Sequence, residues 1–594
     1  MSKNILIAIA WPYANSEIHV GNITGSHLPG DIVARYHRLK GNKVLMVSGT
    51  DSHGTPVTLR ADAAGRPVEE VYKEYHNGFL ELFQQMGIHY DLFTTTHTEN
   101  HFKVAQSIFL ALQQNGYLYA KKSMQWYSPA ANRFLPDRYI EGTCYLCGYE
   151  GARSDQCDQC GNVLEPEKLL DPRSKIDDST PELRETEHYF LDLSKLEPEV
   201  ADFLRARQHY MRDTVIGESL GKIEAEGLKP RSITRDLDWG VPVPTEGWDG
   251  KCLYVWFEAV IGYLSAPVEW SRINNTPDAW RDWWTNPEAQ AFYFIGKDNV
   301  FFHTSMWPAE LKGAGQQFME IFAEEGGQNL NMPYDVPANQ YMNLEGQKIS
   351  GSRNWAVWGR DFLTRYDPDA LRYYLTVIMP ENRDTDWSWA GFQARNNNEL
   401  VANWGNLANR VLSFAYNNWD GHIPTPGDLR PIDKDILAAI EAGFDIVGKL
   451  FEAVKLRAAL AETMRLATEV NKYLDQAAPW KEIKTDKAAA ATTIYTAMRV
   501  IDSLKVLFAP ILPFTSEHLH TTLGYTEPLF GEQVVETHVD NLGEHTVLRY
   551  LPDKAAGRWE SSQLPPGKAF QKPQPLFRKL DASIVEEERT RLGV

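Results

Sequence analysis

The chain has 594 residues, of which 43% are hydrophobic and 12% aromatic, so it can form roughly three to five globular domains and is not disordered. Its net charge of −19 excludes a uniformly basic surface for nucleic acid, and any such contact must depend on local basic sites, as between residues 348 and 372. The N-terminus has one lysine and a short apolar run without a cleavage region, so we expect no signal peptide, no membrane span and a cytoplasmic protein.

The first predicted element is Ile5–Ala10, a run of mostly β-branched residues whose lack of polar alternation predicts a strand buried on both faces of a parallel sheet. A turn follows, and Ser16 is a candidate cap for a helix with His19, Gly21 and Asn22 in its first turns. Such a helix start favours phosphate, and Gly21 leaves room for a base or a ribose. On these residues alone, a helix cap or a packed side chain is the simpler interpretation.

A helix and a second strand come next. Residues 28–39 have helical spacing, with a kink or restart at Pro29-Gly30, and Lys43–Ser48 has the length of a strand. This strand leads to Asp51, and ligands of open α/β sheets bind beyond the carboxyl ends of the strands. Asp51 is therefore placed to bind a cation such as the ammonium group of an amino acid, with a helix cap or turn former as the alternative.

Residues 60–115 have the pattern of amphipathic helices, and a group of four cysteines follows them. Two C-x-x-C pairs, each followed by glycine, suit one tetrahedral zinc ion, with two local disulfides or a redox pair as alternatives. Four thiolates leave no open position, so the metal is expected to be structural. Residues 117–231 around it are expected to form an insertion that splits an α/β domain. The four candidate ligands are Cys144, Cys147, Cys157 and Cys160, and Cys252 is interpreted as a small buried residue.

The α/β pattern returns after the insertion. Apolar residues between 253 and 263 share one helix face, Ala291–Gly296 predicts a buried strand, and residues 300–311 predict a helix. His303 and Trp307 are four apart on that last helix and share a face. They are candidates for the core, or for a pocket that takes a long apolar side chain.

A loop with phosphate-binding chemistry follows at residues 348–353, with the sequence KISGSR. Lys348 and Arg353 can balance the charge of a triphosphate, and the serines and the backbone can donate hydrogen bonds to it. Alone the pattern is weak.

The C-terminal half is predicted to be mostly helical. Residues 369–376 predict a helix, and apolar residues at 400, 404, 407 and 411 and the runs 435–475 and 487–522 have the spacing of a bundle. The simplest interpretation is a structural bundle. Residues from about 551 are proline-rich and then charged, and a monomer is the default expectation. The expected domains are residues 1–116, 117–231, 232–338, 339–389, 390–550 and 551–594.

Taken together, the H-V-G-N and K-I-S-G-S stretches resemble the two ATP-binding signatures of class I aminoacyl-tRNA synthetases. Across residues 4–550 the chain resembles the methionyl-tRNA synthetase family in particular, through the blocks WPYANSEIHVGN, GTDSHGTP, the C-x-x-C pairs, SITRDLDWG, YVWFEAVIGY, FIGKDNVFFH, QKISGSR, DPDALRYYL, NLANR and APW. The insertion of about 115 residues is too short for the editing domain of the related enzymes for leucine, isoleucine and valine.

The resemblance implies an α/β fold, in which a Rossmann-type parallel-sheet catalytic domain is split by the zinc-bearing insertion and followed by an α-helical bundle that binds the anticodon. It implies ATP-dependent activation of L-methionine to methionyl-adenylate, with Mg2+ bound to ATP, and transfer of the methionyl group to the 3′ end of tRNA(Met) for translation initiation and elongation. This chemistry needs no protein nucleophile, because the site positions the reactants and stabilises charge on the phosphoryl group.

The resemblance also implies roles for individual residues. The residues implied in catalysis are His19, Asn22, Arg235 and Lys348. Those implied in ATP binding are His19, Gly21, Asn22, Lys348, Ser350, Gly351 and Ser352. Those implied in methionine binding are Trp11 near the pocket mouth, Tyr13, Asp51, Trp256, Ala259, Tyr263, His303 and Trp307. Those implied in anticodon binding are Asn406, Arg410 and Trp480, with the four cysteines as zinc ligands.

Three positions depart from the family pattern. Asn22 stands where histidine is usual, so it can donate a hydrogen bond but cannot be charged. Gly351 stands where a second lysine is usual, and we expect Lys348 or Arg353 to compensate for that charge. Val260 replaces a frequent proline and changes only local shape. Two other classes stay open: a small-molecule nucleotidyltransferase, which would not need so long a helical bundle, and a non-catalytic tRNA-binding relative, which Gly351 favours.

Overall fold

A seven-stranded sheet forms the centre of the catalytic half, in the strand order β14-β13-β1-β2-β3-β19-β18. The first five strands in this order are mutually parallel. They are β14 Ala338–Asn339, β13 Gln290–Gly296, β1 Asn4–Ile9, β2 Lys43–Thr50 and β3 Leu92–Thr95. The computed structural model describes residues 2–593 other than Asp158, Val163 and Glu325, and for Asp137 and Ser352 it describes the backbone alone.

The strand predicted at the N-terminus is confirmed, and it is buried on both faces. Ile5, Ile7 and Ile9 pack into one hydrophobic core, whereas Leu6 and Ala8 pack into another. Successive side chains of a strand point to opposite faces, so an unbroken apolar run is what two cores require. The first core also contains helices α2 and α4 and the C-terminal helices, and the second contains α5, α8 and α10. The bounds of these helices are α2 Leu28–Leu39, α4 Val68–Met86, α5 Glu99–Gln114, α8 Val255–Ile273 and α10 Trp307–Ala323.

The helix after β1 differs from the prediction at its start. His19, not Ser16, caps α1 (Val20–Asn22), because the ring of His19 accepts the free backbone N–H groups. The irregularity expected at Pro29-Gly30 lies one turn earlier, in a π-helical segment at Ile23–His27, and Pro29 occupies the first turn of α2. Gly30 allows α2 to approach β1, since a Cβ there would lie 2.1 Å from Cδ1 of Ile9.

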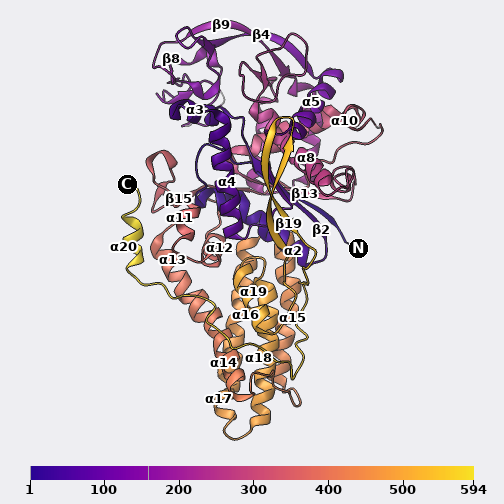
Figure 1. Ribbon diagram of the computed structural model, residues 1–594, viewed down its shortest axis with the longest axis vertical. Coiled ribbons are helices and arrows are strands. Elements are labelled where there is room, and N and C mark those ends of the chain that lie inside the picture. Colours follow the sequence, from indigo (N-terminus) through magenta and orange to yellow (C-terminus); the bar gives the residue numbers. More distant parts are fainter. Residues whose placement is uncertain (1, 158, 163, 325, 594) are drawn as a thin grey trace.

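The insertion forms its own sheets at the top of Figure 1. Strand β4 (Leu118–Ser128) pairs with β9 (Glu182–Leu191), and β10 (Arg231–Ser232) returns the chain to the catalytic domain. The predicted split of the α/β domain by an insertion is confirmed, because the parallel sheet contains strands that precede the insertion in the sequence and strands that follow it. One strand was missed: β3 lies within residues 60–115, which were expected to be helical.

The helical bundle forms the lower end of the molecule in Figure 1. Its helices are α14 Asn406–Asn418, α15 Pro431–Glu452, α16 Leu456–Ala477, α17 Pro479–Glu482, α18 Lys487–Phe508 and α19 Pro513–Thr522. The helical runs predicted at residues 435–475 and 487–522 are confirmed as helices. Residues 532–551, at the end of the expected domain 390–550, form instead the hairpin β18 (Glu532–Asp540) and β19 (Gly543–Leu551), and β19 adds antiparallel to β3 at the edge of the seven-stranded sheet.

The C-terminal segment returns along the bundle to the catalytic half. The backbone of Trp559 donates to Leu39 at the end of α2, and that of Gly593 donates to Asn354 beside the KISGSR loop. Helix α20 (Ile584–Arg589) lies beside α13 (Trp389–Arg395) at the left of Figure 1. Among the described residues, every helix is too short or too polar to span a lipid bilayer.

Candidate active site

The fold brings the two phosphate-binding stretches into contact at the carboxyl end of β1. A Cβ at Gly21 would lie 3.2 Å from Cδ1 of Ile349, so the KISGSR loop rests against the start of α1. The segment that follows the loop forms an antiparallel backbone bridge with the start of α1. In this bridge Val20 N–H donates to Val357 O at 2.9 Å, and Gly359 N–H donates to Ile18 O at 2.9 Å. Gly21 therefore lets Ile349 of the loop approach the helix start closely.

His19 and Asn22 cap each other at this helix start. Nδ1 of His19 accepts from the backbone N–H groups of Gly21 (3.1 Å) and Asn22 (3.3 Å), and Oδ1 of Asn22 accepts from His19 N–H at 3.2 Å. Burial lowers the pKa of His19 to about 4, so the ring is neutral at pH 7. Because Nδ1 is an acceptor, the proton of the neutral ring is on Nε2. His19 can therefore donate from Nε2 to a phosphate oxygen, and the exposed Asn22 can donate from its amide NH2.

The KISGSR loop is held by a short hairpin, β15 (Met342–Leu344) and β16 (Gln347–Lys348). Ser350 exchanges backbone hydrogen bonds with Trp355 at 2.9 and 3.0 Å. A Cβ at Gly351 would lie 3.1 Å from the ring of Trp358, a tight but not prohibitive contact. The side chain of Ser352 lies outside the described part of the structure.

A second lysine that the sequence analysis missed faces the same ring as Lys348. The ammonium groups of Lys297 and Lys348 lie 3.7 and 5.5 Å from the ring centroid of Tyr341. Lys297 also pairs with Asp384 at 2.9 Å, and the hydroxyl of Tyr341 donates to Asp298. Lys297 follows directly after β13, so the rule that pointed to Asp51 would also have found it.

Asp51 follows β2 directly and forms an isolated parallel bridge with Tyr13. The backbones of Ala14 and Asp51 are joined by a hydrogen bond of 3.1 Å, and Oδ1 of Asp51 accepts from His53 N–H at 3.2 Å. The side chain is almost fully buried. Burial raises the pKa of Asp51 well above its usual value, and the nearby Glu258 carboxylate raises it further. An ammonium group would relieve both effects, so Asp51 is suited to bind one.

The aromatic residues expected around methionine gather between α8 and the segment after β13. Tyr13 meets the ring of Trp256 edge to face at 6.0 Å, and Trp256 stacks on Phe302 at 4.3 Å. The hydroxyl of Tyr263 donates to Nε2 of His303 at 2.7 Å, because Nδ1 of His303 donates to Asn299 O at 2.8 Å. Burial lowers the pKa of His303 to about 4, so this pair is neutral.

Three further residues expected at the methionine site have packing roles. The indole of Trp11 lies between Gly49 and Gly262, where a Cβ on either glycine would come within 2.7 Å of the ring. Trp307 is fully buried and donates from its indole to the hydroxyl of Tyr293 at 3.2 Å. Ala259 is buried on α8, three residues after Trp256.

A buried network behind Asp51 was not recognised in the sequence. The carboxylate of Glu258 bonds the ring of His53 at 3.0 Å and the ring of His101 at 2.6 Å. Burial opposes ionisation of Glu258, but the two imidazoles outweigh it and lower its pKa to about 2. Glu258 lies opposite the predicted apolar face of this helix, where a glutamate is ordinary, so its burial could not be read from the sequence.

Arg235 lies on β11 (Thr234–Arg235), between the insertion and α8. Its guanidinium is 3.7 Å from the ring centroid of Tyr254, the residue that precedes α8, and it donates to Thr234 O at 2.9 Å.

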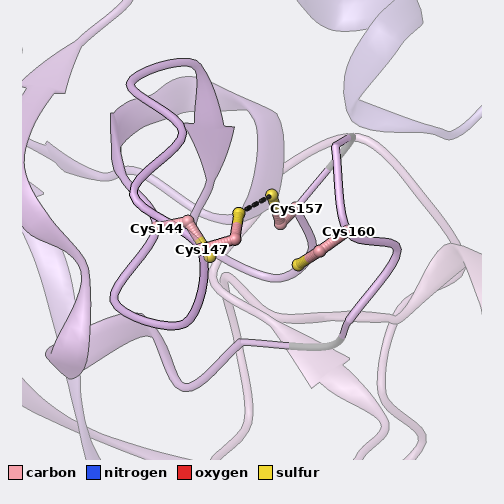
Figure 2. Close-up of side chains that lie close together, drawn as sticks. All are labelled: Cys144, Cys147, Cys157 and Cys160. Atoms are coloured by element: carbon pink, nitrogen blue, oxygen red, sulfur yellow. Dashed lines mark hydrogen bonds between the residues drawn. The ribbon is translucent and has the colours of Figure 1, made fainter.

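The four cysteines of the insertion converge, as Figure 2 shows. Their sulfur atoms all lie within 4.8 Å of one another, and those of Cys147 and Cys157 are 3.6 Å apart, so the four are free thiols and form no disulfide. Tetrahedral zinc with bonds of about 2.3 Å separates its sulfur ligands by about 3.8 Å. The donor set and its spacing therefore fit a metal ion with four thiolate ligands.

The three residues expected at the anticodon site lie on α14 and α17, two helices of the bundle in Figure 1. Asn406 is exposed one turn before Arg410 on α14, and Trp480 lies on α17. The guanidinium of Arg410 lies 4.5 Å from the ring centroid of Trp480 and bonds Asn471 at 3.2 Å. The structure thus brings Arg410 and Trp480 together on one surface.

Comparison with known proteins agrees with this arrangement. The family model "tRNA synthetases class I (M)" matches residues 5–412, and the "Anticodon binding domain of methionyl tRNA ligase" matches residues 423–548. The methionine–tRNA ligase of Thermomicrobium roseum is 50% identical over 100% of this chain and 99% of its own, and that of Chloroflexus aggregans is 49% identical over the same shares.

A solved structure of Mycobacterium tuberculosis methionyl-tRNA synthetase in complex with methionyl-adenylate has the same fold. Its TM-score is 0.75 at 24% identity, with 97% of this chain and 100% of that chain covered. The family match over more than half of the residues, together with relatives of this similarity over the full length, shows that the chain belongs to the methionine–tRNA ligase family of class I tRNA synthetases.

Proposed function

We propose that the chain activates L-methionine with ATP to form methionyl-adenylate and transfers the methionyl group to the 3′ end of tRNA(Met). The observation that supports this most directly is the contact between the His19 helix start and the KISGSR loop, with Asp51 and the aromatic pocket at the same end of the parallel sheet. A phosphate site beside a buried carboxylate suits a substrate with an ammonium group and an apolar side chain.

In this proposal the methionine ammonium binds Asp51, and the side chain enters the space lined by Tyr13, Trp256 and the Tyr263–His303 pair. The methionine carboxylate attacks the α-phosphate, the bond to pyrophosphate breaks, and no protein atom forms a covalent bond. Exclusion of water by the aromatic rings strengthens each of these polar contacts.

Charge on the phosphates is stabilised from two sides. Nε2–H of His19 and the amide of Asn22 donate from the helix start, where the helix dipole adds to the effect. Lys348 supplies a positive charge from the KISGSR loop, and Lys297 beside the same Tyr341 ring adds to it when the phosphates replace Asp384 as the partner of its ammonium group. Mg2+ bound to ATP would share this charge.

We further propose one structural zinc ion on Cys144, Cys147, Cys157 and Cys160, because four thiolates leave no position for a substrate. Asn406, Arg410 and Trp480 would bind anticodon bases by hydrogen bonding and stacking. We infer a monomer that acts in the cytoplasm, and the six domains expected from the sequence remain our division of the chain, with the hairpin β18–β19 assigned to the catalytic sheet.

Exchange of pyrophosphate into ATP, measured with each of the twenty amino acids and without tRNA, tests this proposal. We expect methionine alone to support exchange, and Lys348→Ala to lose it, whereas Lys312→Ala on the exposed side of α10 keeps it. No exchange from folded, zinc-loaded protein would refute the enzyme and leave the non-catalytic tRNA-binding relative as the better account.

A further inference from the structure

The lower end of the bundle contains a hollow of about 400 Å³, between the end of α14 and the start of α18. The residues that line it and matter here are Asn418, Trp419, Asp420, His422 and Lys487. Its volume lies within the range of small-ligand sites, and it has an aromatic ring, a cation and hydrogen-bonding groups of both kinds.

Trp419 offers a stacking surface in this hollow. Its side chain is half-buried, and the ammonium group of the exposed Lys487 lies 5.8 Å from its ring centroid. The amide of Asn418 donates to Phe414 O at 2.9 Å, which leaves its oxygen as an acceptor at the rim. The carboxylate of Asp420 is a second acceptor, and His422 donates from Nδ1 to Asp420 O at 2.8 Å.

The hollow lies near the proposed anticodon surface. The ring of Phe414 lies 6.0 Å from that of Trp419 and 6.3 Å from that of Trp480. Both indoles therefore contact one phenyl ring, and the guanidinium of Arg410 lies 4.5 Å from the ring centroid of Trp480. A row of rings and cations of this kind matches splayed-out bases of a single strand.

Charge at this end of the bundle also fits RNA. Lys481, Lys484 and Lys487 are exposed along one short stretch, and within the described residues none of them forms an ion pair. Lys487 is the one of these that lines the hollow, and in a chain of net charge −19 it supplies a local positive charge for a phosphate.

We propose that the Trp419 hollow binds a nucleotide of the anticodon loop outside the three anticodon positions. Its base stacks on Trp419, its exocyclic amine donates to Asn418 or Asp420, and an adjacent phosphate lies near Lys487. The inference rests on the proposed function, because it requires the chain to bind tRNA(Met).

Binding of a fluorescently labelled anticodon stem-loop of tRNA(Met) to the full chain tests it. We expect Trp419→Ala to raise Kd about 5- to 100-fold and Trp419→Phe to recover most of that loss, because stacking needs a ring face. Tyr119→Ala, at an exposed aromatic residue of the insertion, should leave Kd unchanged. Lys487→Gln should reduce the slope of log K against log salt by about 0.7, the value for one phosphate contact on a single strand.

A second arm locates the base. Each loop position outside the anticodon is made abasic in turn, and one position should weaken binding to the unmodified protein but not to Trp419→Ala. Methionine-dependent pyrophosphate exchange and the melting temperature of every variant control for folding.

The outcomes separate the two proposals. Loss of affinity in Trp480→Ala with no change in Trp419→Ala overturns the hollow and leaves tRNA binding intact. If Trp419→Ala weakens binding equally for the intact stem-loop and for every abasic stem-loop, the hollow does not bind one particular base, and the proposal is overturned. Unchanged affinity in both variants contradicts the anticodon site itself.

Discussion

Replacing Glu258 with glutamine should change how methionine binding depends on pH. Asp51, the proposed partner of the methionine ammonium, has a pKa raised well above its usual value by burial and by the negative charge of Glu258. Glu258 keeps that charge because His53 and His101 hold it ionised. Bound ammonium favours the carboxylate form of Asp51, so methionine binding should release a proton below the pKa of the free site.

The sign and size follow from this linkage. Affinity is complete above the pKa of free Asp51 and falls as the pH drops through it, by up to tenfold for each pH unit. The carboxylates of Asp51 and Glu258, which contact the backbone N–H and the ring of His53 respectively, repel each other by about 1–2 kcal/mol at an effective dielectric constant of about 20. Glu258→Gln removes this repulsion in the free site, so the pH at which the affinity for methionine begins to fall should move down by about 0.7–1.5 pH units.

The assay is the Kd for methionine by calorimetry between pH 5.5 and pH 8.0, with Glu269→Gln as the matched control. Glu269 lies on the same helix α8 and bonds the ring of His545 at 2.9 Å, far along the helix from Asp51. A Kd of the unmodified protein that is constant over this range refutes the raised pKa of Asp51. Equal changes in both glutamine variants show that Glu258 acts through packing and not through its charge.

Three other predictions concern separate parts of the molecule. Lys297→Ala should lower the rate of pyrophosphate exchange about 10²- to 10³-fold, as we expect for Lys348→Ala, with little change in the KM for methionine. An exchange rate equal to that of Lys312→Ala would contradict a role of Lys297 at the phosphates. Cys147→Ser should lose the bound zinc measured by atomic absorption and melt at lower temperature, whereas Cys252→Ser, outside the cluster, retains the metal. Glu588→Ala should weaken the packing of α20 against the rest of the chain by about 1–3 kcal/mol, because Arg365 and Tyr366 lose the carboxylate that they bond at 2.7 and 2.9 Å. Hydrogen exchange of residues 345–354 should then be faster, and an unchanged rate shows that α20 does not restrain the loop.

Local patterns in the sequence predict what depends on neighbouring residues. The run Ile5–Ala10 identified β1, because burial in two cores requires continuous apolar side chains. The cysteine spacing identified the cluster, because each C-x-x-C turn places two thiols together. Asp51 followed from its place after a strand.

Other features depend on contacts between distant parts of the chain. The hairpin at residues 532–551 mixes polar and apolar residues on an edge strand, and it follows a long stretch with helical periodicity, so it was not predicted as strands. The short turn at Asp540–Gly543 between two alternating segments was the available signal. His19 is a cap because its ring turns back on Gly21 and Asn22, and histidine is not among the residues preferred there. The pairing of Glu258 with two histidines likewise joins residues from three separate elements.

The contact between the KISGSR loop and Trp358 explains how the chain differs from its family at Gly351. A larger residue there would press on Trp358, whose indole donates to Asn354 at 2.8 Å and whose ring centroid lies 6.0 Å from that of His19. Displacing Trp358 would therefore disturb the His19 cap through the backbone bridge that joins the two. A lysine at this position would add charge at the expense of that contact, whereas Lys297 adds charge from β13 without touching it. The positive charge and the close packing are thus supplied by different elements, and the glycine is compatible with both.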